Sequence, residues 1–122
     1  MKYLCLIYSA ESTWQSMAKA DADAMVAEYT AFSDAIKKSG HFVGGNRLQP
    51  IDTATTVRVR NGKLSATDGP FAETKEQLGG YYMVEARDLN EAIQLAGKIP
   101  GARLGSIEVR PIAESHLTSV NT

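Results

Sequence analysis

Two short segments of this chain are apolar at every position rather than at alternate positions: residues 3–8 and residues 81–84. Because successive side chains of a β-strand point to opposite faces of a sheet, both segments are predicted to be strands covered on both faces. This feature restricts the fold more than any other. It requires a sheet that has a layer of other residues on each side.

Helical periodicity is clearest in residues 21–39, where apolar side chains recur at spacings of three and four. Acidic residues begin this stretch, and Lys37, Lys38 and Gly40 mark its end. A second helix is predicted after Asp88, which forms a variant capping box with Glu91 and precedes a helix that ends at residues 99–101. Residues 11–20 have little pattern and are expected to form a loop or a short helical turn.

Three other segments are predicted to be extended. Residues 41–48 contain the pair Gly44-Gly45, which indicates a β-bulge or a close approach to the backbone. Residues 56–60 and 63–67 alternate around Asn61-Gly62, the pattern of a hairpin with a type I′ turn. The last strand covers residues 104–112.

The resulting order is β-α-β, hairpin, β-α-β. It predicts an α+β fold of the ferredoxin-like, split βαβ type with an inserted β-hairpin. Residues 1–112 would form a single domain, followed by a polar tail over residues 113–122. Two helices cover only one face of such a sheet, so we expect a homodimer with the sheets face to face.

Composition excludes several classes of function. With 13 basic and 14 acidic residues and no block of like charge, the chain lacks the pattern of a protein that binds nucleic acid or a membrane surface. Cys5 is the single cysteine and lies in an apolar run, so we expect no disulfide, no metal site and no cofactor. The apolar N-terminal run is too short for a signal peptide, which predicts a cytoplasmic protein.

Chemistry-bearing residues concentrate between the hairpin and the next strand. Asp68-Gly69-Pro70 predicts a rigid corner, since Gly69 can adopt positive φ and Pro70 fixes its own. Phe71 adds an apolar side chain, and a mixed-charge cluster follows. Its members are Glu73, Lys75 and Glu76.

This segment and the following Leu78-Gly79-Gly80-Tyr81-Tyr82 resemble the signature of DGPF-motif proteins, a branch of the YCII-related family. The resemblance extends over most of the chain, from Gly44-Gly45 to the ending at residues 105–111. It implies small dimeric α/β-barrel proteins of ferredoxin-like fold, often encoded beside extracytoplasmic-function sigma factors. Their activity is generally unassigned.

The wider family carries a His–Asp pair that is proposed as catalytic, with its His on the first helix. Residues 21–39 contain no His in this chain, whose two histidines are His41 and His116. By resemblance, only the acidic partner has a counterpart, and Asp68 is the residue expected in that role.

Each candidate residue has a structural and a functional interpretation. Asp68 either caps the turn or exchanges protons beside a cleft, and Glu73 with Lys75 form a polar lining, an ion pair or ordinary solvated charges. Each expected ligand-binding residue likewise either contacts a ligand or is an ordinary strand or core residue. These residues are His41, Gly44, Gly45, Arg47, Phe71 and Tyr81.

Three hypotheses follow. The first is a cofactor-independent enzyme of the isomerase or lyase type, which acts on a small acid in the barrel cavity through Asp68, Glu73 and Lys75. The second is a non-catalytic sensor or accessory protein linked to a sigma factor. In the third, the corner is a structural clasp, with Phe71 in the core and the charges tying the hairpin to the sheet.

Overall fold

The computed structural model describes residues 1–113. Four antiparallel strands form the main sheet in the order β2-β5-β1-β6, which confirms the ferredoxin-like plan. The strands of this sheet are β1 Lys2–Ser9, β2 Phe42–Arg47, β5 Gln77–Glu85 and β6 Ser106–Pro111. No helix within the described residues has the length and apolarity that crossing a lipid bilayer requires.

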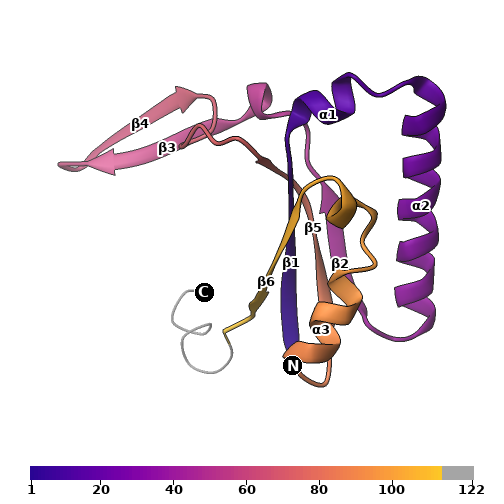
Figure 1. The fold of residues 1–122 in the computed structure, drawn as a ribbon. Helices are drawn as coiled ribbons and strands as arrows, with labels where there is room; N and C mark the ends of the chain where they lie inside the picture. The colour runs from indigo at the N-terminus through magenta and orange to yellow at the C-terminus, as the bar shows by residue number, and fades with distance from the viewer. Residues whose placement is uncertain (114–122) are drawn as a thin grey trace.

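Two helices lie on one face of this sheet (Figure 1): α2, Lys19–Lys38, and α3, Leu89–Ala96. Helix α2 begins two residues before the predicted position, since Lys and Ala are good helix formers. The predicted short helical turn is α1, Glu11–Gln15. Two 3₁₀ turns, η1 at Ile51–Thr53 and η2 at Pro100–Arg103, complete the connections.

The core lies between the helices and the sheet. Tyr3 and Cys5 of β1 are buried there, and the ring of Phe32 from α2 contacts the ring of Tyr82 edge-on at 5.1 Å. The Asp88 carboxylate accepts a hydrogen bond from the Glu91 N–H and begins α3 as predicted. The helices therefore bury one face of the strands that are apolar on both.

The other face of the sheet, here called the open face, also carries apolar side chains. They project from β1 and β5, are half-buried by their strand neighbours and do not belong to the buried core. These side chains are Leu4, Leu6, Tyr8, Leu78, Tyr81 and Met83. Within residues 1–113, no helix covers this face (Figure 1).

Strands β3, Thr55–Arg60, and β4, Lys63–Asp68, form a separate two-stranded hairpin. Asn61 and Gly62 have φ values of 54° and 74°, which confirms the type I′ turn. Figure 1 shows the hairpin projecting from one end of the main sheet, on the side opposite α2. The hairpin is thus an appendage rather than a part of the core.

The corner after β4 is built differently from the structural predictions. Gly69 has a φ of 100° as expected, but its N–H donates to the Ala54 carbonyl at 2.7 Å, and its own carbonyl accepts from the Thr56 hydroxyl at 2.8 Å. The Asp68 carboxylate accepts no hydrogen bond from residues 1–113, so the prediction that it caps the turn was wrong. Phe71 is 81% exposed, so the prediction that it fills the core was also wrong.

Candidate active site

A cleft with a volume of about 830 Å³ opens between α2 and the β2 edge of the main sheet, on the helix-covered face. This volume is within the range of small-molecule pockets, about 300–1,000 Å³. Its lining comes from α1, α2, β1, β2, β5 and the segment after β2. The cleft is therefore formed by one chain and does not require a second copy.

The floor of the cleft is formed where β2 meets β5. A Cβ atom on Gly45 would lie 2.9 Å from the Tyr81 carbonyl oxygen and 2.9 Å from Cδ1 of Tyr82, so the Tyr82 ring rests directly on the Gly45 backbone. Just before it, the strand register shifts between Phe42 and Gly44. Both expectations for the glycine pair, a bulge and a close approach, are confirmed.

Polar groups also reach the floor from α2. The hydroxyls of Ser33 and Tyr82 share a hydrogen bond of 2.7 Å. One turn earlier, the Tyr29 hydroxyl accepts a hydrogen bond from the Gly101 N–H at 3.1 Å. Burial raises the pKa of Tyr29 above its ordinary value of 10.0, so this phenol is neutral at physiological pH.

At the mouth, the Arg47 guanidinium carbon lies 5.6 Å from the centroid of the Trp14 ring. This geometry is a cation–π contact, which leaves the guanidinium N–H groups available. The Arg47 guanidinium makes no ion pair and no hydrogen bond with another side chain or with the backbone of residues 1–113. The cleft therefore has a cation whose donors are free to bind an anion.

Trp14 is held in place by the short helix α1. The first residue of this helix, Glu11, accepts a hydrogen bond from the Ile51 N–H at 2.8 Å and donates its own N–H to the Gln77 side chain at 3.0 Å. The Trp14 ring also lies 6.4 Å from the Tyr29 ring, centroid to centroid. The segment without a clear sequence pattern thus carries the aromatic wall of the cleft.

Three carboxylates line the cleft, and two of them are engaged. Glu11 accepts from the Ile51 N–H, and Asp23 forms an ion pair with Lys19 at 2.7 Å. Asp34 has no hydrogen-bond or ion-pair partner within the described part of the chain. It is thus the one lining carboxylate whose oxygens remain available.

The structure brings three of the predicted ligand-binding residues to the cleft: Gly45, Arg47 and Tyr81. Tyr81 contributes its backbone to the floor of the cleft, whereas its side chain lies on the open face, where its hydroxyl accepts a hydrogen bond from the Asn46 side chain at 2.9 Å. Gly44 does not line the cleft, and nothing lies within 4 Å of the position its Cβ would take.

The predicted catalytic residues lie elsewhere and are exposed: Asp68 is the last residue of β4, whereas Glu73 and Lys75, like Phe71, lie between β4 and β5. Glu73 and Lys75 form no ion pair with a described residue, which fits ordinary solvated charges. One charge of this segment does tie it to the sheet, since Glu76 accepts a hydrogen bond from the Ser106 hydroxyl at 2.9 Å.

His41 lies outside the cleft, in a row with Ser39 and Glu91. Its Nδ1 is 2.6 Å from the Ser39 hydroxyl, and its Nε2 is 3.5 Å from a Glu91 carboxylate oxygen. The row resembles a catalytic triad, but Ser39 is the C-terminal cap of α2. A helix C-terminus presents carbonyl oxygens, which repel an oxyanion instead of stabilising it. We therefore assign the row to holding α2 against α3.

Within residues 1–113, no group of three or more His, Cys, Asp or Glu side chains is arranged to hold a metal ion. His116 and the polar tail lie outside the described residues, apart from Ala113.

Sequence reasoning missed the aromatic and hydroxyl residues of the cleft, Trp14, Tyr29 and Ser33. Tyr29 and Ser33 are four residues apart on α2 and so share one helix face. A serine on an otherwise apolar, inward face was the available signal. Trp14 gave none, because nothing local indicates that α1 folds over the end of β2.

Comparison with known proteins identifies the chain by family. A protein described as uncharacterized from Rhizobium meliloti (strain 1021) is 36% identical over 115 residues, with 93% of both chains covered. Among solved structures, 5-chloro-2-hydroxyhydroquinone dehydrochlorinase (TftG) from Burkholderia phenoliruptrix AC1100, in complex with 2,5-dihydroxybenzoquinone, superposes with a TM-score of 0.56. That match covers 96% of this chain and 98% of the other at 14% identity, a likeness of fold alone. The model of the YCII-related domain matches residues 1–116, and the chain belongs to the YCII-related family.

Proposed function

We propose that this protein binds a small planar anion, of the hydroxylated aromatic or aromatic acid class, in the cleft between α2 and the β2 edge. The observation that carries the proposal is the unpaired Arg47 guanidinium, held over the Trp14 ring at the mouth of the cleft. Arg binds a carboxylate or a pair of adjacent oxygens with two parallel hydrogen bonds. Such a cation makes an anionic group the natural anchor of the ligand.

The deeper residues suit the remainder of such a ligand. The rings of Tyr29 and Tyr82 provide apolar surface, and their hydroxyls with that of Ser33 provide donors and acceptors for ring substituents. The dihydroxybenzoquinone in the TftG structure is a planar molecule of this size class. Its presence in a protein of similar fold supports the choice of ligand class.

Acid–base catalysis without a cofactor is the more specific form of the proposal. Asp34 is the group in this cleft best placed to exchange a proton, since its carboxylate is not engaged by other residues of the described chain. Arg47 would then stabilise negative charge on the substrate. A catalytic role for Asp68, Glu73 and Lys75 stays a prediction. Such a reaction would take place at a different site from this cleft.

The homodimer is part of the proposal. The apolar open face supports it, because monomeric proteins rarely leave a contiguous apolar sheet face in water. Membership of the DGPF branch rests on the segment 68–76, and a cytoplasmic location is proposed with it. A sensor linked to a sigma factor is the alternative, and it predicts ligand binding without turnover.

Calorimetric titration tests the binding site. Hydroxybenzoquinones, hydroxybenzoates and benzoates are titrated into wild-type protein and into Arg47→Gln. We expect micromolar to millimolar binding by one of these classes and a loss of affinity of at least tenfold in Arg47→Gln. The matched control is Arg58→Gln, which removes an exposed guanidinium from the hairpin and should leave affinity unchanged.

The controls separate the outcomes. Equal losses in both Arg variants would mean that binding follows net charge rather than the cleft, and the proposal would fail. If a ligand binds, its consumption is followed by absorbance with wild type and Asp34→Asn. Turnover that Asp34→Asn abolishes supports the catalytic form, whereas binding without turnover supports the sensor.

A further inference from the structure

We propose that the β3–β4 hairpin, residues 55–68, is an arm that packs against a second copy of the chain. The inference rests on the homodimer proposed above. It adds the hairpin to the open face as a second part of the dimer interface.

The strand register gives the hairpin two unlike faces. Val57 pairs with Ala66 and Val59 with Leu64, so these side chains share one face, where Val57, Val59 and Leu64 are 59%, 58% and 72% exposed. The opposite face is polar and basic. Its residues are Thr56, Arg58, Arg60, Lys63, Ser65 and Thr67. One face of the hairpin therefore has the composition of a buried surface while it is exposed to solvent.

The hairpin also lacks support from its own domain. Strands β3 and β4 pair with each other and with no strand of the main sheet. Its attachment is at the base, where Gly69 bonds to Ala54 and to the Thr56 hydroxyl. An isolated two-stranded hairpin is marginally stable in water at best. A stable hairpin of this composition needs a surface on which to place its apolar face.

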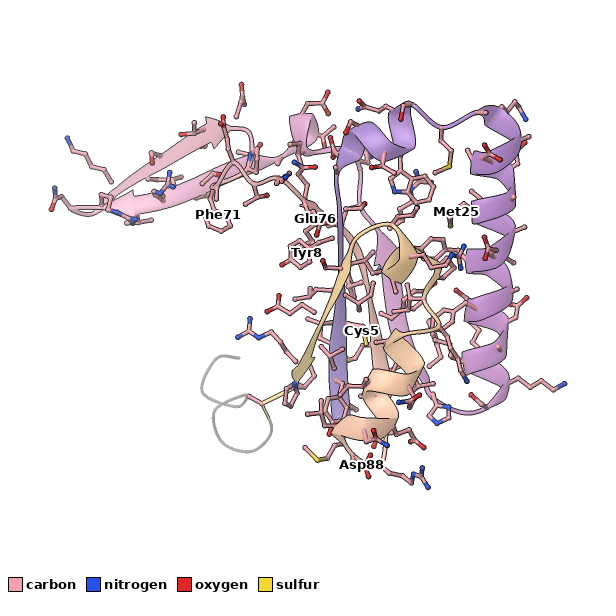
Figure 2. All side chains as sticks on the ribbon, in the orientation of Figure 1. Cys5, Tyr8, Met25, Phe71, Glu76 and Asp88 are labelled. Atoms are coloured by element: carbon pink, nitrogen blue, oxygen red, sulfur yellow. The ribbon has the colours of Figure 1, made fainter. Side chains whose placement is uncertain are left out.

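The position of the arm indicates where the surface that covers its apolar face lies. The hairpin projects on the open-face side of the main sheet, at a large angle to its strands (Figure 1). A six-residue strand is about 20 Å long and packed sheets lie about 10 Å apart. A layer stacked on the open face therefore lies beside the arm along half of its length. Figure 2 shows Phe71 beneath the hairpin and Tyr8 pointing away from the helices, into the same corner.

A second copy is the occupant that the open face fits. Its centre is apolar, around Leu6 and Met83, while Glu108 and Arg110 of β6 carry opposite charges at its edge. An apolar centre with a polar rim is typical of protein interfaces. Each copy offers one arm and one open face on the same side, so a twofold axis satisfies both at once. Residues 55–76 with the open face provide roughly the 20–30 residues a side of a standard interface.

Hydrogen–deuterium exchange of the wild-type chain tests the arm without substitution. The 13.2 kDa chain is diluted across the dissociation range of the dimer, with its mass followed by light scattering. We expect the amides of β3 and β4 to become protected with the same concentration midpoint as the doubling of mass. Exchange in α3, which is remote from the arm, is the internal reference (Figure 1).

A pair of double variants locates the contact on one face of the arm. Val59→Ser with Leu64→Ser should weaken dimerisation at least tenfold. Arg58→Ser with Lys63→Ser introduces the same residues, one in each strand, on the opposite face and should change it less than threefold. All four side chains are exposed, so circular dichroism of each variant should match that of wild type.

Each failure has a distinct signature. A dimer whose arm amides exchange at the rate of free peptide would overturn the arm and leave the dimer standing. A mass of one chain at every concentration up to ~100 µM would overturn both, whereas ligand binding by the cleft would be unaffected. Equal effects of the two double variants would show that the apolar face does not make the contact.

Discussion

At the residue scale, the cleft depends on small differences between neighbouring positions. Gly44 and Gly45 are adjacent and identical in type, yet the first faces open space while the second supports the Tyr82 ring. The sequence predicted that the pair mattered, because glycine in a strand is costly without a reason. It did not distinguish the two, since that distinction depends on the register with β5.

Substitution of Gly45 by Ala should destabilise the protein by about 1–3 kcal/mol, the usual cost of overpacking. The new Cβ would lie 2.9 Å from a backbone oxygen of Tyr81 and from the Tyr82 ring. Gly44→Ala is the matched control. It should be neutral or stabilising by up to about 1 kcal/mol, because it restricts the unfolded chain without a clash. Urea unfolding of both variants measures the difference, and equal stabilities would contradict the role assigned to Gly45.

At the scale of elements, the strongest sequence patterns were confirmed, while the functional roles expected of the unusual motif stay predictions. The stripe of α2, the capping box of α3 and the Asn61-Gly62 turn are local signals, and local physics determines them. Functional roles were predicted for residues 68–76 because the composition of this segment is unusual. Where a loop lies in space depends on distant contacts, and the structure places this one on the exposed side opposite α2.

The start of α3 provides a prediction about pH. The hydrogen bond from the Arg87 N–H to the Glu91 carboxylate, at 2.9 Å, lowers the pKa of Glu91 below its ordinary value of 4.5, and the charges of Arg87 and His41 act in the same direction. A lowered pKa in the folded state stabilises the fold above the unfolded pKa, and this contribution is lost as pH falls through the folded value. Glu91→Gln keeps an acceptor but removes the charge.

Glu91→Gln should therefore be less stable than wild type at pH 6–7, and the difference should shrink as the pH falls below 4.5. Thermal unfolding at a series of pH values measures it. Glu73→Gln, which removes an exposed carboxylate that forms no ion pair with a described residue, serves as the control for the loss of one charge. A stability difference for Glu91→Gln that persists unchanged into acid would contradict the ionic contribution of Glu91.

At the scale of the whole molecule, the two strands that are apolar on both faces require a covering layer on each side of the sheet. One chain supplies only one of these layers. Helices α2 and α3 cover one face, and Leu4, Leu6 and Tyr8 remain on the other. The fold followed from the order of elements, because the split βαβ plan has few alternatives. The cleft did not follow, because it forms between α1, α2 and β2, which are separated in sequence and meet only when the sheet is assembled.

Cys5 offers a measure of how this assembled sheet opens. It lies on β1 between β5 and β6, it is fully buried, and burial raises the pKa of its thiol from 9.0 to about 11. Only the thiolate reacts with disulfide reagents, and the reagent must also reach the sulfur. Because the Cys5 side chain lies in the core between the helices and the sheet, labelling requires this core to open.

At pH 8, the native protein should therefore react with a thiol reagent at least a thousandfold more slowly than the chain in guanidinium chloride, which should label once, at its single cysteine. In the limit of rapid reclosing, the ratio of the two rates gives the free energy of opening. That value should match the stability from urea unfolding and should fall in Gly45→Ala. Rapid labelling of the native protein would show that the core around Cys5 opens without global unfolding.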